Sequence, residues 1–273
     1  MAAREPTAVP ARAGLAWARE GLESLAASPA VWMGITLLFL LMGIVITVIP
    51  FAGMLWGVIV PIHTGGLMLG CRALRQGRPL EVRYLFNGFE APRLQPLALV
   101  GALYLAGSLI VMLPVMALMI GGTLASAIAL GSTGGSTGSL VGIGVIGSIA
   151  LLVTLAAGMA LSLALWFAPA LVVFDDVPAL DALKASLRAG WANIGAFVVY
   201  GLVLVGVGLV AVSPLVATLL LVVARGTDQS GPIAAVLLGG TGIFAIFCIL
   251  LLIPAAWGAM YASYEDVFPS PDS

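Results

Sequence analysis

The chain alternates between long uncharged apolar stretches and short segments that contain its charged residues. No Asp, Glu, Lys or Arg occurs between Glu23 and Arg72, between Arg93 and Asp175, between Arg188 and Arg225, or between Asp228 and Glu265. Each stretch exceeds the roughly 20 apolar residues that cross a bilayer, and most are long enough for two crossings. The pattern therefore predicts an all-α, polytopic helical membrane bundle.

Turn-forming residues divide these stretches into six spans arranged as three hairpins. Pro50 and Gly53 interrupt the first stretch, a run of Gly, Ser and Thr at 131–139 interrupts the second, and RGTDQSGP at 225–232 precedes the last span. The predicted spans are 31–49, about 54–70, about 96–120, about 140–167, about 194–212 with an apolar extension to 224, and about 233–261. We treat residues 1–273 as a single integral membrane domain.

A short amphipathic segment precedes each hairpin. The three segments are residues 13–27, 79–89 and 178–191, and each places several large apolar residues at helical spacing. Such helices usually lie in the plane of the membrane interface, with the apolar face toward the acyl chains. The sequence therefore predicts one interfacial helix before every hairpin.

Matching residues indicate that one unit occurs three times. Gly21, Gly88 and Gly190 lie near the ends of the amphipathic segments, and the second and third units end in FDDV (174–177) and YEDV (264–267). We place the units at about 10–74, 79–174 and 178–268, the first being the most diverged because it ends in CRAL. Each unit is predicted to contain an interfacial helix followed by a transmembrane hairpin.

Composition and charge support a membrane location and give the chain an orientation. Hydrophobic residues make up 62% of the sequence and charged residues only 8%, whereas soluble domains carry roughly 25% charged residues. Arg225 is the one cation on one side of a six-span arrangement; on the other side lie Arg4, Arg12, Arg19, Arg72, Arg75, Arg78, Arg83, Arg93, Lys184 and Arg188. The positive-inside rule then predicts that both termini are cytoplasmic.

Three stretches carry a resemblance to a known family. They are LWFAPALVVFDDVPALDALKASLRAGWANIGAFVVYG (165–201), PIHTGGLMLGCRAL (61–74) and YASYEDVF (261–268). Over most of its length the chain resembles a family of uncharacterised six-span bacterial inner-membrane proteins. More distantly, it is similar to the membrane domain fused to some glycerophosphodiester phosphodiesterases, although it is too short to include their catalytic domain and has no acidic metal-binding cluster of that kind. The resemblance implies an architecture and an inner-membrane location, but no catalytic residue.

A G-x-G-x-x-G pattern occurs at 142–147. In a dinucleotide site this pattern follows a strand, opens a helix and is followed by an acidic residue roughly 20 positions later. Here it lies inside an uncharged run, and the first acid downstream is Asp175. We interpret these glycines, and the small residues Thr154, Gly158 and Ser162 that follow, as positions where helices pack closely.

Three residues within the spans are candidates for function. His63 is the single histidine and lies beside Pro61. An ionisable residue at membrane depth is a functional candidate by default, but we favour a structural role in which the imidazole bonds to a carbonyl freed by Pro61. Pro114 and Pro214 lie within the third and fifth spans. They keep open a transport site built from the backbone of broken helices.

Two acidic pairs, Asp175/Asp176 and Glu265/Asp266, follow equivalent spans. We expect salt bridges from these carboxylates to cytoplasmic cations, namely Arg83, Lys184 or Arg188. The alternative is a polar cytoplasmic vestibule that binds a cation or a lipid headgroup. The densest basic cluster would attract anionic lipid headgroups, and its members are Arg72, Arg75, Arg78 and Arg83.

These features favour a non-enzymatic inner-membrane protein that organises lipid or binds a protein partner or a second copy of itself. No catalytic, cofactor-binding or metal-binding motif is present, Cys71 and Cys248 have no paired spacing, and a net charge of −1 gives no support to nucleic-acid binding. The spans lack central charges, which disfavours proton-coupled transport. A carrier or channel for a lipid or small uncharged solute is the alternative, and an intramembrane enzyme that uses His63 is less favoured.

Overall fold

A computed structural model shows a chain that is helical along nearly its whole length. It describes residues 4–131, 137–225 and 227–269, and their side chains apart from 118, 119, 122–131, 137–146, 225, 227–230 and 233. The described residues contain helices and no strand, which confirms the all-α prediction. Most of the predicted loop at 131–139 lies outside the described residues.

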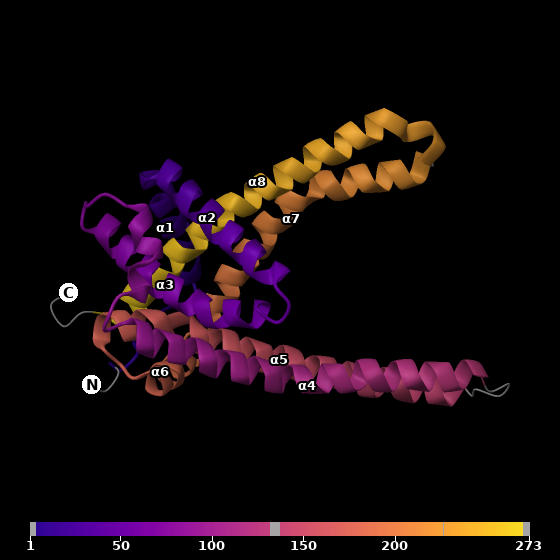
Figure 1. The fold of residues 1–273 in the computed structure, drawn as a ribbon, viewed down its shortest axis with the longest axis horizontal. Helices are drawn as coiled ribbons and strands as arrows, with labels where there is room; N and C mark the ends of the chain where they lie inside the picture. Colours follow the sequence, from indigo (N-terminus) through magenta and orange to yellow (C-terminus); the bar gives the residue numbers. More distant parts are fainter. Residues whose placement is uncertain (1–3, 132–136, 226, 270–273) are drawn as a thin grey trace.

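Helices and two 3₁₀ turns follow one another along the described residues. They are α1 (Ala13–Ala27), α2 (Pro29–Val48), α3 (Gly53–Arg75), η1 (Val82–Leu85), η2 (Asn87–Phe89), α4 (Leu94–Gly131), α5 (Thr137–Asp175), α6 (Ala179–Ala192), α7 (Ile194–Arg225) and α8 (Thr227–Val267). Among the residues described, six helices are long and apolar enough to cross a membrane. They pair as α2–α3, α4–α5 and α7–α8, which confirms the six predicted spans (Figure 1).

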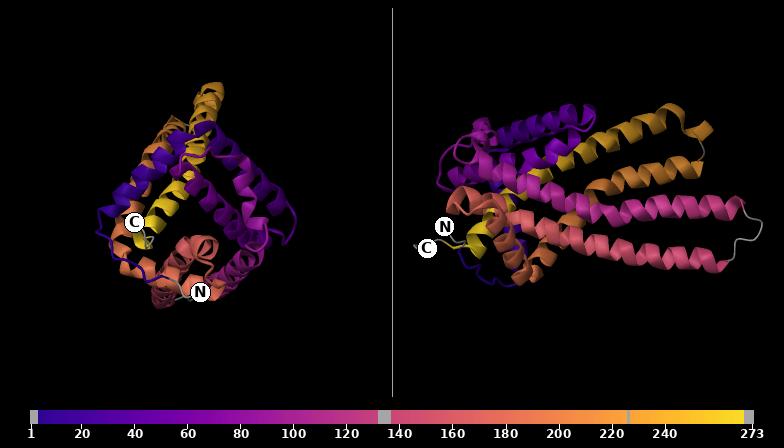
Figure 2. Two further views of the ribbon diagram at one scale, coloured as in Figure 1. Left: turned by 90° about the vertical axis from the view of Figure 1, so that its left-hand side faces the viewer. Right: turned by 60° about the horizontal axis from the view of Figure 1, so that its bottom comes forward.

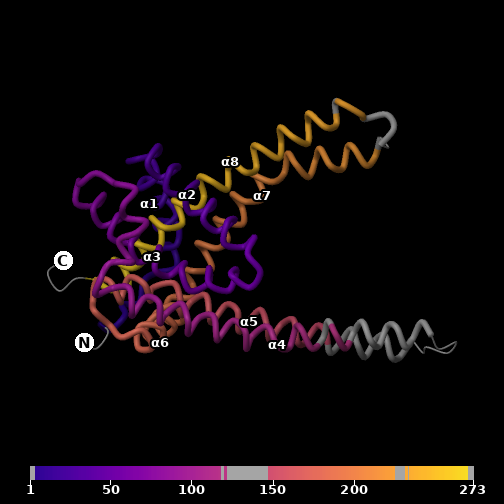
Figure 3. Tube along the Cα trace, viewed as in Figure 1, coloured from indigo at the N-terminus to yellow at the C-terminus, as the bar shows by residue number. Residues whose placement is uncertain are grey.

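The three hairpins meet at one end of the molecule, which we call the base. The α4–α5 and α7–α8 hairpins leave the base in different directions, and the first and last described residues lie at the base (Figures 1 and 3). Large buried side chains concentrate there, including Trp17, Trp32 and Phe167. Farther out, side chains such as Leu152 and Val210 are exposed, as expected for faces that contact lipid.

The predicted interfacial helices at 13–27 and 178–191 are α1 and α6. The buried face of α6 consists of small residues, whereas that of α1 combines two glycines with Trp17 and Leu25. Other large apolar residues, such as Leu22 and Trp191, stay exposed. Both helices therefore keep some large apolar residues exposed, and α1 also buries two of them.

The segment at 79–89 differs from the prediction because it forms η1 and η2 in place of an α-helix. Asn87 and Gly88 lie between Phe86 and Phe89, and both disfavour a helix interior. Gly88 also packs against α3 so closely that a Cβ would overlap the carbonyl oxygen of Ile62. Tight docking onto α3 therefore replaces a regular helix.

The short segments dock on the hairpins in a closed ring. The segment α1 packs on the α7–α8 hairpin, η1 and η2 pack on the α2–α3 hairpin, and α6 packs on the α4–α5 hairpin. Viewed from the base, the elements surround a common centre (Figure 2, left). Each predicted unit thus places its segment on the hairpin of the preceding unit, and the first unit uses the third. The ring has the connectivity of a threefold repeat, which itself stays a sequence prediction.

The structure describes parts of two glycine-containing stretches that the sequence analysis interpreted. The G-x-G-x-x-G stretch lies inside α5, so it does not follow a strand. However, a Cβ on Gly147 or Gly158 would meet no atom within 4 Å, so the predicted close packing is wrong at these two positions. In the predicted turn at 225–232, residue 226 lies outside the described residues, and Gly231 has non-helical dihedral angles (φ 13°, ψ −122°) that interrupt α8.

Candidate functional site

The base ends of α3, α5 and α8 converge around a pocket of about 340 Å³. Each predicted unit contributes its second transmembrane helix to this central pocket. The N-terminal segment and the three helices supply the lining residues, which are Arg4, Arg72, Arg75, Gln76, Phe174, Tyr261, Tyr264, Glu265 and Phe268.

Asp175 joins three parts of the chain at the edge of the central pocket. Its carboxylate forms an ion pair with Arg4 and accepts a hydrogen bond from the Tyr264 hydroxyl at 2.9 Å. The Asp175 side chain is only 6% exposed. Arg4 also donates to the backbone carbonyl oxygens of Phe268 (3.1 Å) and Pro269 (3.2 Å). The N-terminal segment is thereby tied to the ends of α5 and α8.

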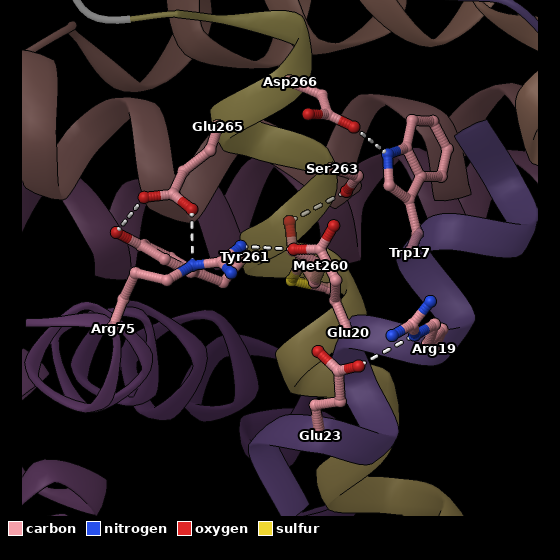
Figure 4. A network of polar contacts seen from close by, with 10 residues as sticks. All are labelled: Trp17, Arg19, Glu20, Glu23, Arg75, Met260, Tyr261, Ser263, Glu265 and Asp266. Carbon is pink, nitrogen blue, oxygen red and sulfur yellow. Dashed lines mark hydrogen bonds and ion pairs between the residues drawn. The ribbon is translucent and has the colours of Figure 1, made fainter. Parts of the chain in front are cut away.

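Glu265 forms a second network, drawn in Figure 4. Its Oε2 accepts from Arg75 Nε at 3.0 Å, and its Oε1 accepts from the Tyr261 hydroxyl at 2.8 Å. The same Arg75 guanidinium forms an ion pair with Glu20 of α1. One arginine therefore links α1, α3 and α8.

The second acid of each pair lies away from the central pocket. Asp176 is exposed and adopts a positive φ of 51° at the end of α5, a conformation that Asp tolerates better than most residues. Asp266 Oδ2 accepts from Trp17 Nε1 of α1 at 2.7 Å (Figure 4). The four acids are thus dispersed, and the described residues contain no group of three His, Cys, Asp or Glu residues placed to hold a metal ion.

The expected salt-bridge partners of the acidic pairs are wrong. Arg83 pairs with Glu81 at 3.0 Å, and Lys184 and Arg188 form no ion pair within the part of the chain that the structure describes. The partners are Arg4 and Arg75, which are distant in sequence, so no local pattern could have identified them.

Arg72 is the cation of the central pocket that lacks a carboxylate partner among the described residues. The centre of its guanidinium lies 4.7 Å from the ring centroid of Phe174, within cation–π range. The carboxylates of Asp175 and Glu265 are already occupied by arginine and tyrosine. The pocket is therefore better suited to an anion or an uncharged polar group than to a cation.

His63 is completely buried in α3. Its Nδ1 lies 2.7 Å from the carbonyl oxygen of Leu85 in η1, and since a carbonyl can only accept, Nδ1 carries the proton. Aromatic rings surround the imidazole, those of Phe39, Trp56, Phe86 and Phe89. The predicted partner, a carbonyl freed by Pro61, is wrong, because His63 instead fastens η1 to α3.

The two mid-span prolines lie in uninterrupted helices. Pro114 is inside α4 and Pro214 is inside α7. A proline leaves the carbonyl four residues earlier without its helical donor, and for Pro214 that carbonyl belongs to Val210. Ser213 Oγ donates to it at 2.9 Å, so the backbone is satisfied locally.

The N-terminal segment contains contacts that the sequence interpretation missed. The Asn193 side chain, at the α6–α7 junction, accepts from Val9 N at 2.7 Å and donates to the Thr7 carbonyl at 3.1 Å. Thr7 N donates to the carbonyl of Val267 at 2.8 Å. In the sequence, an asparagine at the end of an amphipathic helix gives only a weak indication of such contacts, because asparagine is also common as a helix cap.

Comparisons with known proteins agree with this architecture. No solved structure matches the chain significantly. A probable inner membrane protein of Burkholderia thailandensis is 31% identical over 199 residues, which cover 71% of this chain and 73% of that protein. With six candidate spans, the protein is a multi-pass inner membrane protein. Residues 95–264 match a protein family described as a domain of unknown function, DUF7847. The chain belongs to this family.

Proposed function

We propose that the protein is a non-enzymatic membrane-organising protein. The closed ring at the base carries this proposal: it fixes one end of each hairpin, while the described side chains farther along the α4–α5 and α7–α8 hairpins are largely exposed. Lipid acyl chains or the transmembrane helices of a partner then occupy the space beside the hairpins. The angles at which the base holds the hairpins then determine how the neighbouring lipids or partner helices are arranged.

The packing of the base supports this proposal. Trp32 and Trp257 stack at 6.0 Å between ring centroids, and Trp17 meets Phe197 edge-on at 5.4 Å. In lipid, helices associate through close packing and hydrogen bonds, because the hydrophobic effect does not favour one apolar contact over another. Tight contacts at the base therefore hold the hairpins there, and the outer faces remain available to lipid or a partner.

The chemistry of the central pocket supports a non-enzymatic role. General acid–base catalysis needs a titratable group that can reach a substrate. Asp175 and Glu265 are both held by an arginine and a tyrosine. Through these contacts the two acids hold helices together at the base.

A carrier remains the alternative to a membrane organiser. In the sequence, the carrier is supported by two prolines at which broken helices could form a transport site. In the structure, α4 and α7 continue through Pro114 and Pro214. The distant similarity to the membrane domain of glycerophosphodiester phosphodiesterases stays a prediction and does not discriminate between the two functions.

Native mass spectrometry of the protein, extracted from its membrane in lipid nanodiscs, tests the proposal. We expect a fixed complement of lipid, a defined homo-oligomer, or a second protein at constant ratio. The Gly21→Leu variant, which would wedge α1 away from Ala255, should lose that complement. A bare monomer with the lipid composition of the bulk membrane, the same for both proteins, would contradict an organising role.

A further inference from the structure

A second pocket, of about 430 Å³, adjoins the central pocket and shares Arg72 and Gln76 with it. Four arginines and one carboxylate stand among the described residues that line it, and we call it the basic pocket. Its lining residues are Leu69, Arg72, Gln76, Arg78, Arg83, Tyr84, Asn87, Glu90 and Arg93.

The end of α3 positions two of the arginines. Gly77 takes a left-handed conformation (φ 71°), Gly77 N–H donates to the Leu74 carbonyl at 2.9 Å, and Arg78 N–H donates to the Ala73 carbonyl at 2.9 Å. These paired bonds are the Schellman motif that ends many helices. The turn holds Arg78 beside the last turn of α3, which contains Arg72.

The basic pocket keeps an excess of positive charge. Arg83 pairs with Glu81 at 3.0 Å and Arg93 with Glu90 at 3.8 Å, and exposed pairs of this kind are weak. Within the described part of the chain, Arg72 and Arg78 form no ion pair. The Arg78 guanidinium donates to the side-chain oxygen of Gln76 at 2.6 Å.

Arg75 differs from its neighbours although it lies on the same helix end. Its guanidinium is engaged by Glu20 and Glu265, and it does not line the basic pocket. Of the four arginines predicted to attract headgroups, Arg72, Arg78 and Arg83 therefore face this pocket, and Arg93 takes the fourth place.

The outer side of the same segment favours a lipid over a soluble anion. Val82, Phe86, Phe89 and Leu94 are each 36–42% exposed, and Arg83 and Arg93 lie between them in the sequence. Exposed aromatic and aliphatic side chains interleaved with arginines are typical of a segment in the membrane interface. A phosphodiester that carries acyl chains satisfies both sets of residues, whereas free phosphate satisfies only the arginines.

We propose that the basic pocket binds the phosphate of an anionic phospholipid, with Arg72 and Arg78 as its main ligands. Planar guanidinium groups suit phosphate because they can donate two parallel hydrogen bonds. Arg83 and Arg93 add charge from the far side of the pocket, and the acyl chains lie toward Phe86 and Phe89. This inference rests on the proposed function, since the bound lipid is one that the protein organises.

The test uses the full chain in nanodiscs of phosphatidylcholine mixed with phosphatidylglycerol, with retained lipid identified by native mass spectrometry. We expect the wild type to retain phosphatidylglycerol. The Arg72→Gln/Arg78→Gln variant should lose about a hundredfold in affinity, at about tenfold for each guanidinium that hydrogen-bonds the phosphate. The matched control, Lys184→Gln/Arg188→Gln, also removes two exposed cations at the base and should bind as the wild type does.

Equal retention by all three proteins, or equal loss in both variants, would overturn the proposal. So would release of the lipid by inorganic phosphate at constant ionic strength, or an acidic protein bound in place of the lipid. If circular dichroism shows that the Arg72/Arg78 variant is misfolded, Arg83→Gln/Arg93→Gln tests the same pocket from other elements. A fixed lipid complement without preference for phosphatidylglycerol contradicts this inference alone, while absence of any fixed complement contradicts the proposed function.

Discussion

Gly21 of α1 lies against Ala255 of α8 so closely that a Cβ on the glycine would overlap the carbonyl oxygen of Ala255. Gly258, one turn further along α8, would place a Cβ 3.0 Å from the Gly21 Cα. At Gly21 the first and last parts of the chain thus meet backbone to backbone. This contact closes the ring of segments at the base.

Replacing Gly21 with alanine should therefore destabilise the protein by about 1–3 kcal/mol, because the backbone of α8 must shift to admit the methyl group. Thermal unfolding in nanodiscs, followed by circular dichroism, measures the effect. Gly34→Ala is the matched control, since a Cβ there meets nothing within 4 Å, and a helical Gly→Ala exchange is otherwise favourable. Equal stability of the two variants would show that the α1–α8 contact is not tight.

The two neighbouring acids at the end of α5 should respond differently to substitution. Asp175→Asn is expected to cost about 1–3 kcal/mol, because it weakens the bonds from Arg4 and Tyr264 in a largely buried place. Asp176→Asn should change stability by less than about 0.5 kcal/mol, since the side chain is exposed and Asn also tolerates positive φ. Chemical unfolding of both variants checks this, and a larger effect at position 176 would refute the assignment.

His63→Ala separates a structural role from a catalytic one. The substitution removes the bond to Leu85 and empties a space lined by four aromatic rings, so we expect a loss of about 2–4 kcal/mol in stability. Proteolysis of the η1–η2 segment should become faster, because η1 loses its anchor. A variant of wild-type stability that had lost a biological activity would instead favour the intramembrane enzyme.

Pro114→Ala and Pro214→Ala should leave both stability and the bound lipid complement unchanged or slightly improved. The helices already continue through both prolines, and alanine restores a helical donor. Native mass spectra and solute uptake into proteoliposomes are the measurements. Impaired uptake with an intact lipid complement would favour a carrier over a membrane organiser.

The orientation that the distribution of cations predicts is open to a direct test. A reporter inserted near Ser136 should be periplasmic, and one at the C-terminus should be cytoplasmic, since ten of the eleven cations lie on the side of the termini. Alkaline phosphatase and fluorescent-protein fusions distinguish the two compartments. A cytoplasmic reporter near Ser136 would reverse the assignment.

The sequence predicts those features that depend on local pattern and leaves those that depend on distant contacts. Uncharged stretches of bilayer length determine the six spans, and apolar spacing locates α1 and α6, because both signals lie within a few turns. The pair Arg4–Asp175 joins residues 171 positions apart, and no periodicity can show it. Nor can the sequence separate Asp175 from Asp176, because their different roles arise from where α5 ends.

The basic pocket illustrates the same division. Four arginines in 72–83 predict a positively charged region, but they do not show that Arg75 belongs to another network. That assignment depends on Glu20 and Glu265, which approach from the two ends of the chain. Only the folded arrangement decides which cations remain free for a ligand.

The docking of α1 on the last hairpin also sets an order of assembly. The ribosome completes α1 long before α8, and at roughly 5–20 residues per second the interval is on the order of tens of seconds. During that time Trp17 and the glycine face of α1 lack the hairpin against which they pack in the folded protein. Folding of this protein is therefore complete only after α8, the last helix to be synthesised, is in place and α1, the first, has docked on it.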